Sequence, residues 1–235
     1  MSDKVILPIK AMILAAGRGN RLRPLTDTLP KPLVPVCGKP LIEYHIEKLA
    51  AIGITDIVIN HAWLGQTLEQ QLGNGERWGV NIHYSPEPEG GLETAGGIIQ
   101  ALPLLGESPF LVINGDVYCD FQFEHLLSQA KKMCEDNTCL AHLVLVPSPE
   151  HNQIGDFGLN EQQQVIKSGH ETFAGLSVLS PALFKHRAVA FLKLAPILRE
   201  AMQQKQVSGC LFTGYWSDVG TVERLAETQK QLGCN

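Results

Sequence analysis

Several features that define other protein classes are missing from this 235-residue sequence. It contains no run of about eighteen uninterrupted apolar residues, the length that a membrane-spanning helix needs. The opening MSDKVILPIK has too short an apolar run for a secretory signal, so we expect a cytoplasmic protein. The net charge of -5 lacks the basic surplus of a general nucleic-acid binder. We therefore expect neither a nucleic-acid nor a membrane partner, and any bound anion must be held by a local site.

The cysteines lack the arrangements that mark a redox or zinc site, because no CxxC pair and no Cys/His zinc spacing occurs. The six are Cys37, Cys119, Cys134, Cys139, Cys210 and Cys234. In a cytoplasmic protein we expect free thiols, several of them packed as small apolar side chains.

Length and composition predict one large α/β domain, since 44% apolar and 18% charged residues exclude a disordered or collagen-like chain. Up to residue 146, apolar runs alternate with helical periodicity, which is typical of a sheet with crossover helices. We expect strands at 11–17, 56–60, 80–85, 110–115 and 139–146. We expect helices at 40–53, 64–72 and 93–102, and a further helix with Phe123, Leu126, Leu127 and Ala130 on one face.

Beyond residue 147 the predicted elements become shorter and more varied. They are a hairpin at 156–169, a strand at 173–180, a helix at 193–205, a final strand, and an amphipathic helix at 221–232. No internal repeat or low-complexity linker separates this region from the first, and we expect it to face the substrate.

A glycine-rich stretch with four cations, LAAGRGNRLRPLTDTLPKP (14–32), follows the first predicted strand. A dinucleotide fingerprint and a P-loop would both need glycine at the position of Leu22, so both motifs fail. What remains is the spacing G-x-G-x-R-x4-T-x3-P-K from Gly17 to Lys31. In an open α/β sheet this loop lies at the carboxyl ends of strands, where backbone N–H groups, Arg21 and Lys31 can hold phosphates.

This spacing resembles the signature of the sugar-1-phosphate nucleotidyltransferases, which it matches at every fixed position. The resemblance continues through PLVPVCGKPLIEY, LETAGG, NGD and WSDVGT, so it covers essentially the whole chain. It implies a single-domain, Rossmann-like (glycosyltransferase-A-like) α/β fold over residues 1–235, with a mixed, mostly parallel sheet flanked by helices. It also implies a nucleotide-binding part at about 10–146, a sugar-phosphate-binding part at about 147–220, and a monomer or small homo-oligomer.

In this family a sugar 1-phosphate attacks the α-phosphorus of an NTP, pyrophosphate leaves, and a nucleotide sugar forms. The resemblance makes Arg21 and Lys31 the catalytic pair, with Arg21 on the pyrophosphate and Lys31 between the α-phosphate and the sugar phosphate. So many phosphates require Mg²⁺, which prefers one or two carboxylates plus phosphate oxygens. Asp116 in NGD and Asp218 in WSDVGT are the expected metal ligands; the alternatives are a turn residue and a helix cap.

The nucleotide is expected to rest on the end of the first strand and on SPEPEGGLETAGG. Because a carboxylate accepts an N–H, Glu87 could read the imino hydrogen of uracil or the N1–H of guanine, or Glu87 and Glu89 could be merely solvated. The expected nucleotide contacts are Leu14, Ala15, Ala16, Gly17, Gly19, Glu87, Gly91 and Thr94.

For the sugar phosphate, the resemblance points to Gly158 in DFGLN; Lys193, at the start of a predicted helix, and Glu93 are further candidates. Glu93 is alternatively a charge at a helix N-terminus, and Lys193 a surface lysine. Many relatives carry E-K-P where this chain has VIKSG, in which Lys167 is the one basic residue. We expect the histidines His45 and His61 to be structural.

The stretch VINHAWLGQ resembles the branch of the family that couples UTP to N-acetylmuramate α-1-phosphate for peptidoglycan recycling. Guanylyltransferases of mannose 1-phosphate are the alternative. A carboxylated sugar favours a nearby cation, yet LFTGYWSDVG offers none close to Asp218. A non-catalytic nucleotide-sugar sensor is a second alternative, but such a protein should lose a catalytic cation or metal carboxylate, and this chain retains all four.

Overall fold

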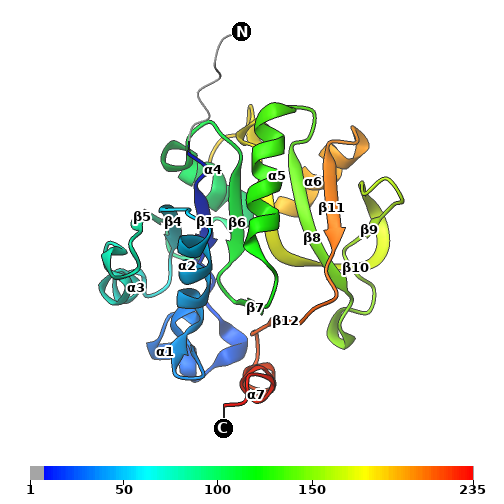
Figure 1. The fold of residues 1–235 in the computed structure, drawn as a ribbon. Helices are drawn as coiled ribbons and strands as arrows, with labels where there is room; N and C mark the ends of the chain where they lie inside the picture. Colours follow the sequence, from blue (N-terminus) through cyan, green and yellow to red (C-terminus); the bar gives the residue numbers. More distant parts are fainter. Residues whose placement is uncertain (1–7, 235) are drawn as a thin grey trace.

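The computed structural model describes residues 8–234 and centres on one mixed sheet (Figure 1). Its strand order is β11-β8-β10-β6-β1-β4-β5, with β9 paired to β10. These strands are β1 (Ala11–Leu14), β4 (Asp56–His61), β5 (Asn81–Pro86), β6 (Phe110–Asn114), β8 (Ala141–Pro147), β9 (Phe157–Leu159), β10 (Val165–Leu179) and β11 (Val207–Leu211). Strands β5, β4, β1 and β6 are parallel, whereas β10 is antiparallel to β6 and β8. The predicted mixed, mostly parallel sheet is confirmed.

Helices cover both faces of this sheet, and alternate strand residues feed two separate cores. The helices are α1 (Leu25–Thr28), α2 (Leu41–Ala51), α3 (Gly65–Leu72), α4 (Glu93–Leu105), α5 (Phe123–Glu135), α6 (Leu194–Gln203) and α7 (Val222–Gln231). Ile13 and Ile57 pack in the core that contains α2, α3 and α5, whereas Met12 and Val58 pack with α4 and α6. Burial on both faces explains why these strands read as continuous apolar runs. Within residues 8–234, none of the helices has the length and apolar character needed to cross a membrane.

One long strand replaces two predicted elements. The second half of the predicted hairpin at 156–169 and the predicted strand at 173–180 form the continuous β10. Its pairing register shifts between Ile166 and Glu171 against β9, and again between Phe173 and Ser177 against β8. These irregularities let β10 change partners along its length without ending. Hydrophobic periodicity does not report such bends, and the sequence therefore predicted a break.

A two-stranded ribbon, absent from the sequence prediction, joins distant segments. It consists of β7 (Val117–Cys119) and β12 (Trp216–Asp218), while a second short pair is formed by β2 (Pro35–Val36) and β3 (Lys39–Pro40). In the first ribbon Asp218 lies opposite Val117, and the N–H of Val219 donates to the Asp116 carbonyl at 2.8 Å. The ribbon therefore brings two carboxylate-bearing segments together.

The structure corrects the prediction that all six cysteines are free thiols, because Cys37 and Cys234 form a disulfide. Their Cα atoms lie 5.6 Å apart, although 197 residues separate them in sequence. Burial raises the pKa of the Cys119 and Cys210 thiols. Cysteine spacing did not indicate the pair, because its two members meet only when the C-terminal helix reaches the β2–β3 turn.

Two buried histidines make stability depend on pH. His45 in α2 lies parallel to the Phe123 ring, and His142 in β8 has its Nδ1 2.8 Å from the Ser208 hydroxyl. Burial lowers the pKa of each imidazole from 6.5 to about 4. Between these values the unfolded chain binds protons that the folded chain does not, so stability is lost as the pH falls.

We expect each of these histidines to reduce the free energy of unfolding by about 3 kcal/mol between pH 7.5 and pH 4. Urea unfolding across this range measures the loss. Carboxylates also titrate near pH 4, so the informative quantity is the difference from the double variant His45→Gln/His142→Gln, whose curve should be flatter. Parallel curves for the two proteins would contradict the assignment.

Candidate active site

Gly19 and Thr26 determine the shape of the glycine-rich loop. Gly19 has a left-handed backbone (φ +69°), and the Thr26 hydroxyl donates to its carbonyl at 2.8 Å. A Cβ on Gly19 would lie 3.0 Å from the Thr26 methyl group and 3.1 Å from the Lys31 Cβ. Both residues therefore pack the loop against the stem of Lys31. The motif spacing between them is explained by this packing, before any ligand is considered.

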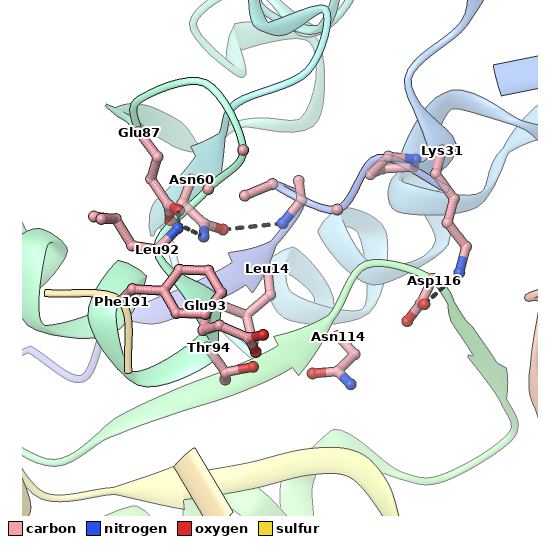
Figure 2. Close-up of a pocket in the computed structure, with 16 residues that line it drawn as sticks. Leu14, Lys31, Asn60, Glu87, Leu92, Glu93, Thr94, Asn114, Asp116 and Phe191 are labelled. Atoms are coloured by element: carbon pink, nitrogen blue, oxygen red, sulfur yellow. Dashed lines mark hydrogen bonds and ion pairs between the residues drawn. The ribbon is translucent and has the colours of Figure 1, made fainter. Parts of the chain in front are cut away.

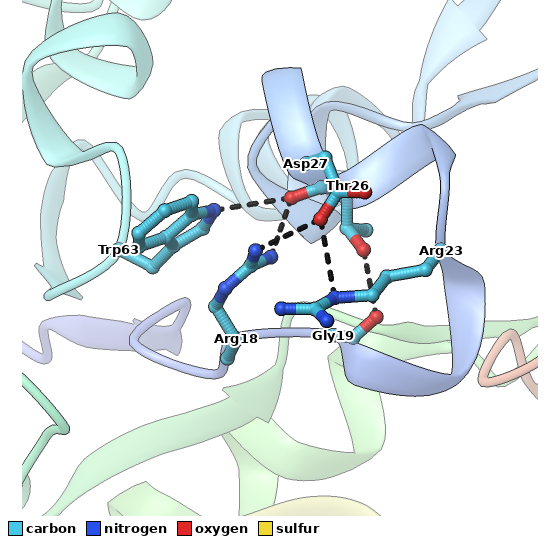
Figure 3. Close-up of polar contacts among 6 residues, drawn as sticks. All are labelled: Arg18, Gly19, Arg23, Thr26, Asp27 and Trp63. Carbon is cyan, nitrogen blue, oxygen red and sulfur yellow. Dashed lines mark hydrogen bonds and ion pairs between the residues drawn. The ribbon is translucent and has the colours of Figure 1, made fainter.

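Arg18 and Arg23 are held by protein partners within the same loop (Figure 3). Arg18 donates to the Thr26 carbonyl at 2.6 Å, pairs with Asp27 at 3.0 Å, and lies 3.7 Å from the centre of the Trp63 ring. The Trp63 indole N–H donates to the same carbonyl at 3.1 Å, and Arg23 pairs with Asp27 at 3.1 Å. These two arginines thus belong to the frame of the loop, although the sequence presents them as equal to Arg21.

A cavity of about 380 Å³ opens beside this loop, at the carboxyl ends of β1, β4 and β6 (Figure 2). Leu14 ends β1 and lies in register with Asn60 of β4 and Asn114 of β6, and all three line the cavity. Of the predicted nucleotide contacts, the residues in its wall are Leu14, Ala15, Ala16, Gly17, Glu87, Gly91 and Thr94. Gly19 is outside the wall, whereas Glu93, predicted for the sugar phosphate, is inside it.

Asn60, which was not among the predicted site residues, connects two walls of this first cavity. Its side-chain carbonyl accepts the Ala15 N–H at 2.9 Å, and its amide donates to Glu87 Oε1 at 2.5 Å. Glu87 Oε2 accepts the Leu92 N–H at 2.7 Å. A Cβ on Gly97 would lie 2.2 Å from Glu87 Oε1, so glycine is required for this approach. Glu87 is therefore anchored by both oxygens, and a base could use only its remaining lone pairs.

The predicted catalytic lysine and one predicted metal ligand are in direct contact. The Lys31 ammonium lies 2.5 Å from Asp116 Oδ2, and both residues line the first cavity (Figure 2). The Lys31 side chain is 10% exposed, whereas the Asp116 side chain is 36% exposed. The loop therefore presents a nearly buried positive charge to a carboxylate that solvent and ligands can reach.

A second cavity of about 290 Å³ shares Asn114 and Asp116 with the first. Its other wall residues are Val117, Asn152, Thr172, Phe173, Ala174, Gly175, Trp216 and Asp218. Asp116 and Asp218 thus face one space, although their segments are far apart in sequence. Asn152 donates to the Thr172 hydroxyl at 2.9 Å, and the Trp216 indole donates to the Ala174 carbonyl at 2.9 Å. Trp216 belongs to the WSDVGT stretch, whereas no motif in the sequence marked Asn152 or Thr172.

The two carboxylates fit a magnesium ion that reaches the site together with phosphates. Within residues 8–234, no group of three or more His, Cys, Asp or Glu side chains is arranged to hold a metal ion. Mg²⁺ needs only one or two protein carboxylates when phosphate oxygens complete its shell. Asp116 and Asp218 provide that donor set beside the first cavity.

A cation does lie next to Asp218, which corrects the expectation from the surrounding sequence. Arg224 of α7 places its Nη2 3.3 Å from Asp218 Oδ2. Arg21 is exposed on the turn Asn20–Leu22, and its Nη2 also lies beside Gly220. A Cβ on that glycine would be 3.2 Å from the Arg21 Nη2. Helix α7 supplies Arg224 from outside the stretch LFTGYWSDVG, and the sequence therefore did not show the contact.

Two predicted sugar-phosphate residues are not brought into either cavity. Gly158 is buried in β9, where a Cβ would lie 2.4 Å from the Ser168 carbonyl oxygen, so backbone packing explains this glycine. Lys193 is exposed at the N-cap of α6, and Lys167 is exposed on β10. His61 is buried 2.7 Å from Glu69, outside both cavity walls.

The strand ends of this sheet carry a glycine-rich loop with cations, beside two carboxylates that face one cavity. This arrangement is typical of proteins that transfer phosphate groups from nucleotides. Residues 10–168 match the profile of the nucleotidyl transferase family, and the chain belongs to that family. It is 54% identical over 230 residues to the N-acetylmuramate alpha-1-phosphate uridylyltransferase of Neisseria meningitidis serogroup B, covering 96% of this chain and 99% of that protein. The family resemblance found in the sequence is confirmed.

A more distant relative agrees with this family, and two solved structures share the fold. The mannose-1-phosphate guanyltransferase of Hypocrea jecorina is 35% identical over 224 residues, which cover 90% of this chain and 61% of that protein. A putative glucose-1-phosphate thymidylyltransferase from Bacillus anthracis superposes with a TM-score of 0.83 at 21% identity, covering 95% of this chain and 94% of that one. A UDP-glucose pyrophosphorylase superposes with a TM-score of 0.75 at 20% identity, covering 97% and 99%. These superpositions confirm the predicted fold.

Proposed function

We propose that this enzyme transfers a uridylyl group from UTP to N-acetylmuramate α-1-phosphate and releases pyrophosphate. The observation that carries the proposal is the pair of adjoining cavities sharing Asn114 and Asp116, in a chain 54% identical to a relative named for that reaction. Such a product would serve peptidoglycan recycling in the cytoplasm.

The cavities suggest how the two substrates meet. The nucleotide occupies the first cavity, whose wall consists of residues up to Asp116 together with Phe191, and the sugar phosphate occupies the second. A phosphate oxygen of the sugar attacks the α-phosphorus in line, and the bond to the pyrophosphate oxygen breaks. Lys31 supplies positive charge where the two phosphates meet, and Arg21 binds the leaving pyrophosphate. When bound, Mg²⁺ held by Asp116 and Asp218 would neutralise part of the phosphate charge.

Guanylyl transfer to mannose 1-phosphate is the second candidate. The anchored Glu87 carboxylate can accept the N1–H of guanine as well as the imino N–H of uracil, since each of its oxygens keeps a second lone pair. The mannose-1-phosphate guanyltransferase of Hypocrea jecorina also supports this candidate by its name, but it is only 35% identical to this chain, against 54% for the uridylyltransferase.

A matrix of pyrophosphate-release assays with Mg²⁺ tests the proposal. UTP, GTP, dTTP and CTP are crossed with the 1-phosphates of N-acetylmuramate, mannose, glucose and N-acetylglucosamine. We expect release with UTP and the muramate phosphate. Release confined to GTP with mannose 1-phosphate would establish the second candidate, and tight nucleotide binding without release from any pair would indicate a sensor.

A further inference from the structure

Each of the two expected metal carboxylates is paired with a cation of the chain itself. Lys31 lies 2.5 Å from Asp116, and Arg224 lies 3.3 Å from Asp218. Lys31 belongs to the glycine-rich motif and has a role in the proposed reaction. Arg224 lies on helix α7, outside the motif, and the proposed reaction gives it no role.

The Arg224 guanidinium is enclosed by the protein. Its side chain is 15% exposed, and its Nε and Nη2 atoms are buried. A Cβ on Gly220 would lie 2.3 Å from Nη2, so the guanidinium rests against the backbone where that glycine has no side chain. Arg224 therefore occupies a slot built into the chain beside Asp218.

Helix α7 is tied to the strand that carries Asp218, which keeps Arg224 in that slot. The Thr221 hydroxyl caps the helix by accepting the Arg224 N–H at 3.3 Å. One helical turn after Arg224, the Thr228 hydroxyl donates to the Ser217 hydroxyl at 3.1 Å. Ser217 precedes Asp218 on β12. The cation and the carboxylate are thus held by one connected unit.

We propose that Arg224 is the internal counter-ion of Asp218 and makes metal binding depend on the nucleotide. A divalent cation entering alone gains two carboxylates but meets the charges of Lys31 and Arg224 at close range, with the Arg21 guanidinium beside that of Arg224. When the metal arrives bound to a triphosphate, the phosphate charge balances these cations. The chain therefore binds metal weakly by itself and more tightly as a nucleotide complex. This coupling rests on the proposed function only for the identity of the nucleotide.

Mn²⁺ titration followed by electron paramagnetic resonance, with the intact protein and no substrate, tests the counter-ion directly. Arg224→Gln is expected to tighten nucleotide-free Mn²⁺ binding by about tenfold or more, because it removes a full positive charge beside Asp218. With UTP present, Arg224→Gln should tighten Mn²⁺ binding by a smaller factor. The ratio of the Mn²⁺ dissociation constant without UTP to that with UTP should therefore be lower in Arg224→Gln than in the wild type. Arg224→Lys, which keeps the charge, should resemble the wild type.

Two further variants separate this effect from general changes of charge or fold. Arg77→Gln removes a charge from an arginine that is 47% exposed and paired with Glu43, so it should leave Mn²⁺ binding unchanged. Gly220→Ala keeps every charge but displaces the guanidinium tip, so it should also tighten metal binding. Unchanged or weaker nucleotide-free Mn²⁺ binding in a folded Arg224→Gln protein would overturn the proposal. That readout needs no turnover, so it stays informative even if the enzyme uses another substrate pair.

Discussion

Replacing Lys31 with alanine is expected to lower kcat by a factor on the order of 10² to 10³, the usual effect of removing one preorganised charge from a transition state. The Lys31 stem packs beside Gly19, and its ammonium reaches Asp116, where the two cavities adjoin. In the proposed reaction, negative charge accumulates there as the sugar phosphate approaches the α-phosphate. Pyrophosphate release at saturating substrates measures the loss.

Lys31→Met is the matched control for this prediction, because methionine retains most of the buried stem and removes only the charge. We expect Lys31→Met to lose as much kcat as the alanine variant, while its urea unfolding curve stays closer to that of the wild type. Normal turnover in a stably folded Lys31→Met protein would remove the lysine from the catalytic machinery.

Asparagine at either carboxylate is expected to lower Mg²⁺-dependent turnover by a factor on the order of 10² or more, since it preserves shape and removes the ligand charge. Asp218 ends one strand of the β7–β12 ribbon, Asp116 directly precedes the other, and both face one cavity, so they should act as a unit. The double variant Asp116→Asn/Asp218→Asn should therefore lose much less than the product of the two single losses. Chelation with EDTA should stop the wild-type reaction, and added Mg²⁺ should restore it.

Asp56→Asn provides the comparison for these carboxylate variants. Asp56 begins β4, at the strand end opposite the cavities, and pairs with His83 at 3.4 Å. This variant should keep the wild-type Mg²⁺ dependence. If Asp116→Asn or Asp218→Asn showed the same turnover and Mg²⁺ dependence as Asp56→Asn, the assignment of the metal ligands would be wrong.

Local patterns in the sequence were sufficient for most of the sheet and for part of the site. Apolar runs such as AMIL and FLVIN identify β1 and β6, because a strand buried on both faces selects apolar residues at every position. The spacing from Gly17 to Lys31 identifies the loop, since the turn at Gly19 and the Thr26 hydrogen bond need those residue types at that separation. Such signals survive in the sequence because both partners lie within a few residues of each other.

Contacts between distant segments were decided by the tertiary structure alone. Four such contacts join segments that meet only when the whole sheet has formed. They are the β7–β12 ribbon, the approach of Arg224 to Asp218, the Asn60–Glu87 hydrogen bond and the Cys37–Cys234 disulfide. Gly158 shows the converse: its motif suggested a ligand contact, but packing against Ser168 accounts for it. The sequence by itself determined the family and the fold class, and it predicted the four charged residues of the reaction. Only the folded chain decided their partners, because pairing across a sheet depends on strand order and register, which local periodicity does not encode.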